Sequence, residues 1–441
     1  MNKKPITKIH MQIPWHEYAI SNDLPSRDAK LSEKASLIGR VGIVMLSGGA
    51  TAWRIRRSMS VIAQTLGVMC IAEIGINTLN YTCVSSHESI SLALSREGIG
   101  VNTLKLQYME SYVQAFEKKY ADKSVDENHS ILDKIDKTPE LYSAGLLALA
   151  AAFACAGFIF NLGGGIAEIV CVFIAAGCGN LARKLIGEAN LSFMLGVVGG
   201  AVSSCLVYAF TMTIARVIFP DIISYGTGYI GSVLFLVPGF PFITSILDFG
   251  KLDMRSGIER LAYSLIVMAF ATTFCWVSAL IFGLDPGVGS GIVMDPGLRI
   301  VFRLIASFVG VIGFSMIFNS PMKMALIAGV IGGFANTVRL ELVDRTNMSA
   351  IICAFIGAFI VGLLAGPVVK KTGFPRVGIT IPAVVVSVPG LFMYRAIYYF
   401  GTGEINQGIM AFLKAAAIVF AIGLGVLFAR YCSARDFRHK D

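Results

Sequence analysis

The sequence is poor in charge and in histidine, and it lacks the short motifs of common catalytic sites. Only 15% of its 441 residues are charged, whereas 55% are hydrophobic, and the mean hydropathy is +0.70. This balance does not suit a soluble enzyme of this length. No P-loop, G-x-S-x-G or H-E-x-x-H motif occurs, and the five histidines are scattered. We therefore expect no metal site and no cofactor.

Paired cysteine motifs and a signal peptide are missing too. None of the nine cysteines forms a C-x-x-C motif and most lie in apolar runs, which is typical of buried, reduced thiols. The residues after Met1 hold no apolar core, so we expect a cytoplasmic N-terminus. The net charge of +9 comes from basic residues in short loops between apolar runs. This pattern indicates a positive-inside bias rather than a nucleic-acid partner.

Long apolar runs dominate the chain after Leu141, and each is near the length of a membrane-spanning helix. Ten spans with a cytoplasmic N-terminus place the C-terminus in the cytoplasm as well. The predicted spans cover residues 142–160, 164–182, 192–216, 222–247, 257–283, 299–318, 322–338, 348–369, 377–399 and 407–429.

Residues 1–140 have a different pattern. Helical spacing of apolar residues covers 30–46 and 51–67, and partial alternation from Met69 to about Leu94 predicts a few strands. We interpret this part as a small cytosolic α+β domain.

The loop charges agree with this topology, with one exception. Basic residues such as Arg183, Lys184 and Lys371 fall in predicted inner loops, and the predicted outer loops are mainly acidic. The exception is the segment RLELVDRTN, which places Arg339 and Arg345 outside. The positive-inside rule still favours this orientation.

The chain contains an internal repeat. Residues 237–258 align without gaps on residues 388–409, with eight of 22 positions identical, including V-P-G and F-G. Further matches occur upstream in the same order: Asn161 with Asn319, and Asn180-x-x-Arg183 with Asn336-x-x-Arg339. Because each copy has five spans, the second copy enters the bilayer from the opposite side. Arg339 then lies outside as the mirrored copy of Arg183.

The predicted fold is therefore mainly α. It is a polytopic membrane protein of about ten transmembrane helices in two inverted five-helix repeats, with a small N-terminal cytosolic α+β domain. The expected boundaries are 1–140 for the cytosolic domain, 141–284 and 285–430 for the two repeats, and 431–441 for a cytosolic tail. Inverted repeats of this kind are a common build of secondary transporters.

One Pro-Gly pair interrupts the fourth span of each repeat. The pairs are Pro238-Gly239, followed by Pro241, and Pro389-Gly390. Proline removes a backbone donor, and such a backbone is tolerated in a membrane only against a cavity or other protein. The helix start after a break carries a positive partial charge that can hold a carboxylate. A plain packing kink is the alternative.

Two carboxylates are candidates for proton coupling. Glu168 lies inside the second predicted span, and Asp248 lies near the cytosolic end of the fourth. A partly buried carboxyl group can carry a proton because desolvation raises its pKa. The alternative for Asp248 is an interfacial acid paired with Lys251 or Arg255, and this reading is favoured for Asp253.

Paired amides at equivalent positions complete the candidate pathway. Asn161, Asn319, Asn180 and Asn336 could bind a small polar or zwitterionic solute, or they could join helices. Arg183 and Arg339 are more typical of headgroup or helix-end contacts.

These motifs resemble the threonine/serine exporter family. The stretch PGFPFITSILDFGKLDMRSGIERL is similar to the family's P-G-x-P, Asp and S-G-x-x-R pattern, SGGATAWRIRRSMSVIAQTLG to its cytosolic motif, and IPAVVVSVPGLFMYRA to its second half. The matching residues are Pro238, Gly239, Pro241, Asp248, Asp253, Ser256, Gly257 and Arg260; Gly48, Thr51, Arg54, Ala63, Leu66 and Gly67; and Pro382, Val388, Pro389, Gly390, Tyr394 and Ala396. The chain departs from the family pattern at Ile55–Arg57, where an acid is common, and at Phe242–Thr244, where an Asn is common.

The resemblance implies a proton-coupled secondary exporter of threonine or serine in the bacterial inner membrane. Its partners would be a small polar solute, protons and the lipid bilayer, and a homo-oligomer is left open. One alternative is a dicarboxylate exporter of the succinate type, since similar two-part members are linked to that activity. Such an exporter should need positive charge at the midplane, for which Arg395 and Lys414 are the obvious candidates in the later spans. A second alternative is a membrane-anchored sensor or enzyme acting through the cytosolic domain, although that domain shows no nucleophile-base-acid arrangement.

Overall fold

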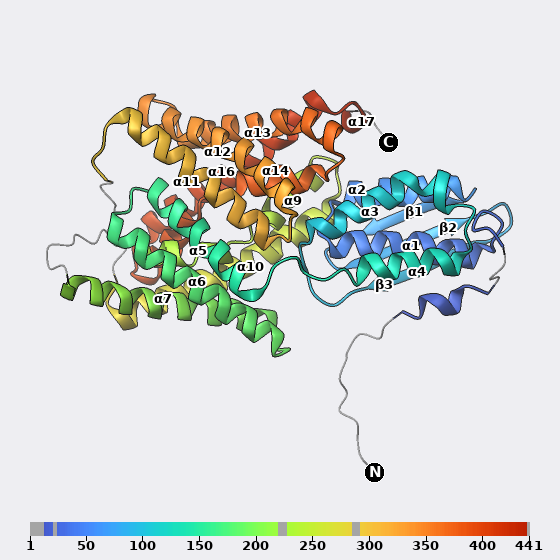
Figure 1. The fold of residues 1–441 in the computed structure, drawn as a ribbon, viewed down its shortest axis with the longest axis horizontal. Coiled ribbons are helices and arrows are strands. Elements are labelled where there is room, and N and C mark those ends of the chain that lie inside the picture. Colours follow the sequence, from blue (N-terminus) through green and yellow to red (C-terminus); the bar gives the residue numbers. More distant parts are fainter. Residues whose placement is uncertain (1–12, 21–23, 219–226, 285–291, 439–441) are drawn as a thin grey trace, which may run out of the picture. The chain divides into compact units, whose positions relative to one another are not determined.

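The structure of the chain is a computed structural model that describes residues 13–20, 24–218, 227–284 and 292–438 (Figure 1). The chain divides into two compact units. One, the N-terminal unit, contains Met1–Pro139 and also the distant segment Asp248–Glu259. The other, the membrane unit, contains Glu140–Leu247 and Arg260–Asp441.

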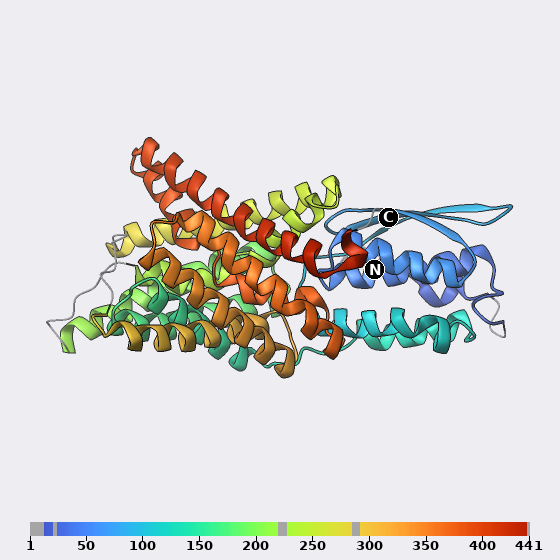
Figure 2. The same cartoon turned by 90° about the horizontal axis from the view of Figure 1, so that it is seen from above.

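The N-terminal unit combines helices with one three-stranded antiparallel sheet in the order β1-β2-β3. Figure 2 shows helix α1 between this sheet and helix α4. The elements are η1 (Trp15–Tyr18), α1 (Leu31–Ser47), α2 (Ala52–Thr65), β1 (Met69–Ile74), β2 (Thr78–Val84), β3 (Ser89–Ser95), α3 (Thr103–Ala115), η2 (Phe116–Tyr120) and α4 (Val125–Asp136).

Buried and half-buried side chains alternate along β2, and the buried ones define one face of the sheet. In β2, Leu79, Tyr81 and Cys83 are buried, and their neighbours in sequence are only half-buried. The hydroxyl of Tyr81 donates a 2.8 Å hydrogen bond to the Ala35 carbonyl, which ties the sheet to α1. The strands predicted between Met69 and Leu94 are thus confirmed, and so are the helices predicted over 30–46 and 51–67.

The membrane unit is helical throughout its described parts. Its elements are α5 (Ala144–Asn161), α6 (Ile166–Glu188), α7 (Phe193–Ile218), α8 (Gly228–Ser232), η3 (Leu234–Leu236), α9 (Gly239–Phe249), α10 (Met254–Phe282), α11 (Pro296–Ile317), α12 (Met322–Arg345), α13 (Ala350–Thr372), α14 (Arg376–Val385), α15 (Gly390–Gly401), α16 (Ile405–Ser433) and α17 (Arg435–Arg438). Helix α9 ends and helix α10 begins within Asp248–Glu259, the segment that belongs to the N-terminal unit.

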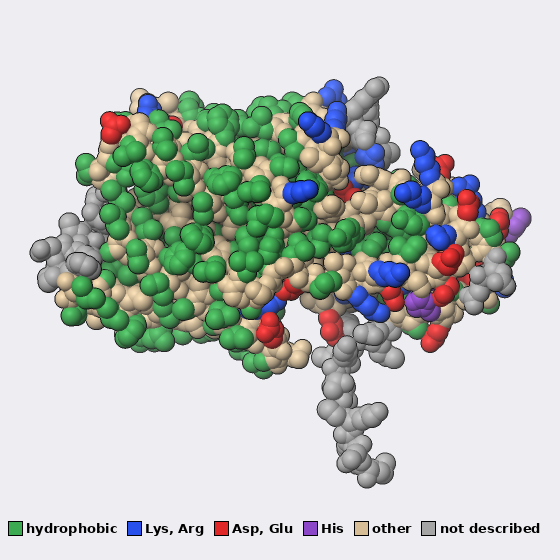
Figure 3. Space-filling model, in the orientation of Figure 1, with side chains coloured by type: hydrophobic (Ala, Val, Ile, Leu, Met, Phe, Trp, Pro, Cys, Tyr) green, Lys and Arg blue, Asp and Glu red, His purple; other side chains and the backbone are tan. Residues whose placement is uncertain are grey.

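Eight of the described helices are long and apolar enough to cross a membrane: α5, α6, α7, α10, α11, α12, α13 and α16. They coincide with eight of the ten predicted spans. The predicted span 377–399 is the bent pair α14 and α15, which would be a ninth. Hydrophobic side chains cover the visible face of this unit (Figure 3). The chain is therefore a mainly helical, multi-pass membrane protein.

The predicted span 222–247 does not form one long helix in its described part. Residues 222–226 lie outside the described residues, and the rest forms the short pieces α8, η3 and α9. Val237 and Pro238 separate η3 from α9 and are not helical. The backbone of Val237 is extended, with ψ 120°.

Two glycines, one on each helix, set the crossing of α5 and α11. A Cβ on Gly157 would lie 2.6 Å from the Ala306 carbonyl oxygen, and one on Gly313 would lie 2.4 Å from that of Ala150. Only glycine allows such close approach of two backbones. The two glycines are 156 residues apart, as are Asn180 and Asn336 of the sequence repeat.

Candidate functional site: the helix breaks of the membrane unit

Both Pro-Gly pairs interrupt helices where the sequence predicts a break. The first, Pro238-Gly239, separates η3 from α9, and the second, Pro389-Gly390, separates α14 from α15 at an angle of 52°. Pro241 lies in the first turn of α9, where a missing amide costs little. At each break a new helix therefore begins inside the unit.

The two breaks pack against one another's helices. A Cβ on Gly239 would lie 2.9 Å from Val385 Cγ2, at the end of α14, and one on Gly390 would lie 2.5 Å from Leu234 Cδ2 in η3. Segments separated by about 150 residues thus meet at the glycine of each break. The contact is reciprocal, as expected for two equivalent elements around an axis.

A pair of tyrosines joins the same two elements. The Tyr229 hydroxyl in α8 donates a 2.8 Å hydrogen bond to the Tyr394 hydroxyl in α15, and both side chains are buried. Their rings meet edge to face with centroids 5.5 Å apart. Sequence analysis missed this contact, because only Tyr394 falls in a recognisable motif and Tyr229 has no counterpart that signals a partner.

The Asn-x-x-Arg motifs fold in the same way in α6 and α12. Arg183 Nη2 donates to Asn180 Oδ1 at 3.0 Å, and Arg339 Nε donates to Asn336 Oδ1 at 2.9 Å. The two residues of each motif are one helical turn apart and face the same side. The amide oxygen thus fixes the guanidinium on the helix surface.

Two of the four predicted amides come together at Ser307 of α11. The Nδ2 atoms of Asn161 and Asn336 approach the Ser307 hydroxyl at 3.1 and 2.8 Å. Asn336 Oδ1 also accepts from Ser387 Oγ, just before the second break, at 3.1 Å. Ser307 and Ser387 were missed because isolated serines in apolar runs give no sequence signal.

The other two amides lie elsewhere. Asn180 Nδ2 donates to the Leu147 carbonyl of α5 at 2.9 Å, and Asn319 Oδ1 accepts from the Leu141 amide at 2.9 Å. Asn319 itself has φ 56° and links the segment before α5 to the turn that follows α11. These bonds join helices within the unit.

Glu168 is fully buried in the first turn of α6. Its Oε2 accepts from the Gly165 amide at 3.1 Å, and its Oε1 accepts from the Gly228 amide at the start of α8 at 3.3 Å. No cation is paired with it among the described residues.

Asp248 is equally buried, but it belongs to the N-terminal unit. Its Oδ1 accepts from the Ala52 amide, the first residue of α2, at 2.9 Å, and its Oδ2 accepts from Ser256 Oγ at 2.8 Å. A carboxylate at a helix N-terminus is stabilised by the exposed amides and the helix dipole. Arg255, one of the two partners considered from the sequence, binds Glu73 and Glu259.

Further contacts hold the same α9–α10 connection to the rest of the N-terminal unit. Arg56 of α2 pairs with Asp253, and the Ile76 amide donates to Glu259 Oε2 at 2.6 Å. Asp253 is thus an ion-paired acid, but its partner in this contact is Arg56 rather than the predicted Lys251 or Arg255. The α9–α10 connection, which follows the first break, therefore binds to α2 and to the β1–β2 turn.

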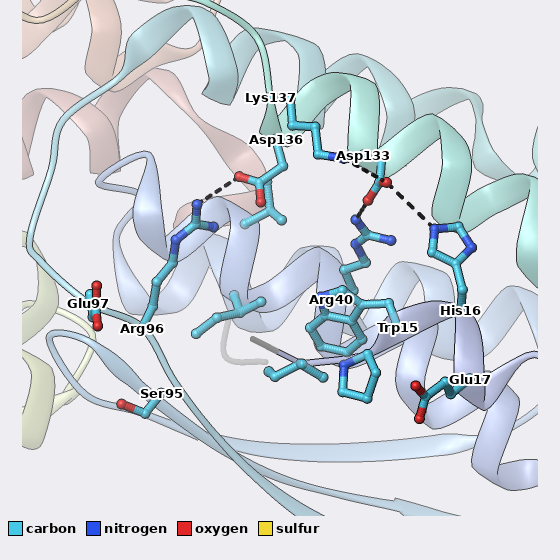
Figure 4. Close-up of a pocket in the computed structure, with 14 residues that line it drawn as sticks. Trp15, His16, Glu17, Arg40, Ser95, Arg96, Glu97, Asp133, Asp136 and Lys137 are labelled. Atoms are coloured by element: carbon cyan, nitrogen blue, oxygen red, sulfur yellow. Dashed lines mark hydrogen bonds and ion pairs between the residues drawn. The ribbon is translucent and has the colours of Figure 1, made fainter. Parts of the chain in front are cut away.

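The N-terminal unit also contains a polar pocket of about 610 Å³ (Figure 4). Arg96 binds Asp136 at 2.9 Å, while Asp133 binds Arg40, Lys137 and His16. Burial alone would raise the pKa of Asp133, but the hydrogen bond and charge of Arg40, and then those of Lys137, lower it to about 2. Positive and negative groups are therefore already matched within the pocket wall.

A serine and a histidine lie together beside this pocket without forming a catalytic site. Ser36 Oγ and His129 Nε2 are 3.1 Å apart, but both side chains are fully buried. Burial, followed by the charges of Arg40 and His16, lowers the pKa of His129 to about 3. No acidic group binds its Nδ1 among the described residues. The pair lacks the access and the orienting group that nucleophilic catalysis needs.

Comparisons with known proteins fit this architecture. A family model for threonine/serine exporters matches residues 36–282, which is more than half of the chain. The chain belongs to the threonine/serine exporter family. A second model, described as "Threonine/Serine exporter, ThrE", matches residues 303–432. The family is one of exporters, in agreement with the resemblance drawn from the motifs.

Individual relatives are distant but cover most of the chain. A "Probable threonine/serine exporter" of Mycobacterium tuberculosis is 22% identical over 90% of this chain and 75% of its own length. The "Threonine/serine exporter" of Corynebacterium glutamicum is 21% identical over 91% of this chain and 82% of its own. The "Probable succinate transporter subunit YjjP" of Escherichia coli is 25% identical over 52% of this chain and 87% of its own. No solved structure matches the chain.

Proposed function

We propose that this chain is a secondary active exporter of threonine and serine, driven by proton entry across a bacterial inner membrane. The observation that carries the proposal is the reciprocal packing of the two helix breaks, Gly239 on Val385 and Gly390 on Leu234. Broken helices from two halves that meet at one place are the usual surroundings of a transporter's substrate. The exporter names of the full-length relatives support the substrate class.

The proposal includes two inverted five-helix repeats, residues 141–284 and 285–430. Three mirrored details support it: the glycines at the α5–α11 crossing, the Asn-x-x-Arg motifs, and the Pro-Gly breaks. Each pair is built from equivalent elements, α5 with α11, α6 with α12, and α9 with α15. An exchange of shape between two such halves would open the pathway alternately to each side.

The breaks, Pro238, Gly239, Pro241, Pro389 and Gly390, form the proposed pathway together with Asn161 and Asn336. Asn180 and Asn319 are proposed to keep the helices in register. Glu168 is the first candidate for proton coupling, because it is buried and its oxygens accept hydrogen bonds from the backbone amides of Gly165 and Gly228. Asp248 is the second candidate, and its contacts with Ala52 and Ser256 favour a mechanical role.

Both termini and residues 1–140 are proposed to lie in the cytoplasm. The N-terminal unit holds the α9–α10 connection, which follows the first break, through Asp248, Asp253 and Glu259. It would therefore influence the movement of α9 during transport.

The test is counterflow in proteoliposomes with labelled threonine, serine, other amino acids and succinate. Vesicles are preloaded with unlabelled solute, and entry of the labelled solute is followed. Selective counterflow of threonine and serine is the expected result. Absence of any counterflow, with protein that is folded and inserted, would overturn the transport proposal.

Dicarboxylate export is the second candidate function. The similarity to the Escherichia coli relative over 240 residues favours it. In the same assay, counterflow of succinate that exceeds that of threonine would select this function.

A further inference from the structure

The two arginines of the repeated motifs are held in matching surroundings. In the first repeat, Arg183 is oriented by Asn180, and its guanidinium lies 5.7 Å from the centre of the Phe235 ring in η3. A Cβ on Gly200 of α7 would lie 3.3 Å from Arg183 Cβ. The side chain thus extends from α6 past α7 toward the element that precedes the first break.

The second repeat reproduces the asparagine and glycine contacts of this arrangement. Arg339 is oriented by Asn336, whose Oδ1 also accepts from Ser387, immediately before the second break. A Cβ on Gly357 of α13 would lie 3.2 Å from Arg339 Cβ. Gly357 and Gly200 are 157 residues apart, so the glycine that admits the arginine is repeated together with the arginine.

Neither arginine has an acidic partner among the residues that the structure describes. Other basic residues of the same helices do. Lys184, the next residue after Arg183, binds Glu140 at 2.5 Å, and Arg303 of α11 binds Glu341 and Asp344 of α12 at 2.7 and 2.6 Å. The acids beside each site are thus already occupied by other cations.

A half-buried guanidinium without a counter-ion has a high desolvation cost inside a membrane protein, so its presence indicates a function. Its planar donors fit a carboxylate in a bidentate arrangement. In each repeat one donor is used by the asparagine, and the remaining donors can bind an oxyanion.

We infer that Arg183 and Arg339 bind the carboxylate of the transported solute, one in each of the two access states. The inference rests on the proposed function, because inverted repeats place the two sites at opposite ends of the pathway. Asn180 and Asn336 act as positioning residues that hold the guanidinium groups toward the breaks. Lipid phosphate is an oxyanion too, so the experiment must separate the two sources.

The experiment uses the full chain in oriented proteoliposomes. The KM and the maximal rate of threonine flux are measured from each side for Arg183→Gln and Arg339→Gln. Loss of a charged hydrogen bond predicts a rise in KM of about ten- to a hundredfold. We expect Arg183→Gln to raise KM for threonine that enters from the cytoplasmic side, where the predicted topology places Arg183 and Lys184. We expect Arg339→Gln to raise KM from the opposite side.

Lys184→Gln is the matched control, since it removes a neighbouring charge that is already paired. Arg→Lys at either site should restore part of the affinity. In the wild type, threonine amide, which lacks the carboxylate, should compete about tenfold more weakly than threonine. An unchanged KM in both Gln variants would overturn the inference, and so would equal competition by threonine and its amide.

Lipid composition separates a solute site from a headgroup site. If the arginines bind lipid phosphate, the Gln variants will lose retained anionic lipid in native mass spectrometry and keep their KM, which contradicts the inference. If the wild type transports no solute, the proposed function fails on its own. The arginines are then tested by thermal stabilisation of the detergent-solubilised chain with threonine and succinate. Stabilisation that both Gln variants retain would overturn the inference.

Discussion

The hydroxyl of Tyr229 donates a 2.8 Å hydrogen bond to the hydroxyl of Tyr394. One tyrosine precedes the first helix break and the other follows the second, so the bond joins the two halves of the membrane unit. Both side chains are almost completely buried, with exposed fractions of 0% and 1%. A buried hydroxyl that loses its partner retains its desolvation cost.

Removing either hydroxyl should therefore destabilise the membrane unit. We expect Tyr229→Phe and Tyr394→Phe each to cost about 1 kcal/mol, as judged from typical buried hydrogen bonds. The double variant should cost little more than one single variant, because the same bond is lost. Thermal unfolding in detergent measures this, with the exposed Tyr108→Phe as control. Fully additive losses would contradict the coupling.

The close contact of the breaks predicts a steric effect on transport. A Cβ on Gly390 would lie 2.5 Å from Leu234 Cδ2, closer than side chains pack. Gly390→Ala should slow threonine flux severalfold, and Gly239→Ala should have a smaller effect, because its nearest atom is 2.9 Å away. Gly145→Ala in α5, where a Cβ meets no atom within 4 Å, is the matched control. Equal flux in all three variants would show that the breaks do not move against each other.

The sequence predicted more of the elements than of their contacts. The lengths of the apolar runs predicted helices such as α5 and α13, and the Pro-Gly pairs predicted both breaks. These features depend on local composition. The partner of Asp248 could not be predicted, since Ala52 is 196 residues away and a backbone amide leaves no sequence signal. The repeat did indicate that Arg183 and Arg339 are equivalent, but only the structure gives the contacts around them.

Glu168 should separate proton coupling from solute exchange. Its carboxyl group is buried and accepts hydrogen bonds from the amides of Gly165 and Gly228, so the side-chain oxygen of a glutamine can keep one of these bonds. We expect Glu168→Gln to abolish uphill transport driven by a pH gradient while counterflow, which needs no net proton movement, persists. Glu188→Gln, at the exposed end of the same helix, is the control. Gradient-driven accumulation that matches the wild type would remove Glu168 from the mechanism.

Asp248 should behave differently from Glu168. Because its oxygens accept from Ala52 and Ser256, loss of the carboxylate loosens the α9–α10 connection. We expect Asp248→Asn to weaken proton-driven export and counterflow together, and Asp248→Ala to weaken both further. Arg56→Gln, which removes the neighbouring contact with Asp253, should give the same pattern. Proton-driven flux of labelled substrate that stays unchanged in Asp248→Asn would refute a role in transport.

His129 makes the stability of the N-terminal unit depend on pH. Burial, with the charges of Arg40 and His16, lowers its pKa in the folded state to about 3, from about 6.5 in the unfolded chain. The unfolded state therefore binds a proton at a pH where the folded state does not. The contribution of His129 to the free energy of unfolding is fully present above pH ~6.5. It falls by about 1.4 kcal/mol for each pH unit as the pH drops from about 6.5 to 3.

Hydrogen exchange of the full chain can measure this slope locally. Between about pH 7 and 5, protection of α4 (Val125–Asp136) should decrease in the wild type beyond the intrinsic effect of pH on exchange. His129→Gln keeps a hydrogen-bonding side chain for Ser36 and cannot titrate, so its protection should change only by the intrinsic effect. Asp133, whose pKa is about 2 in the folded state, remains ionised throughout this range and does not contribute. A wild-type slope equal to that of His129→Gln would show that the folded chain accepts the proton at His129 without cost, contrary to the buried position of His129 on α4 against α1.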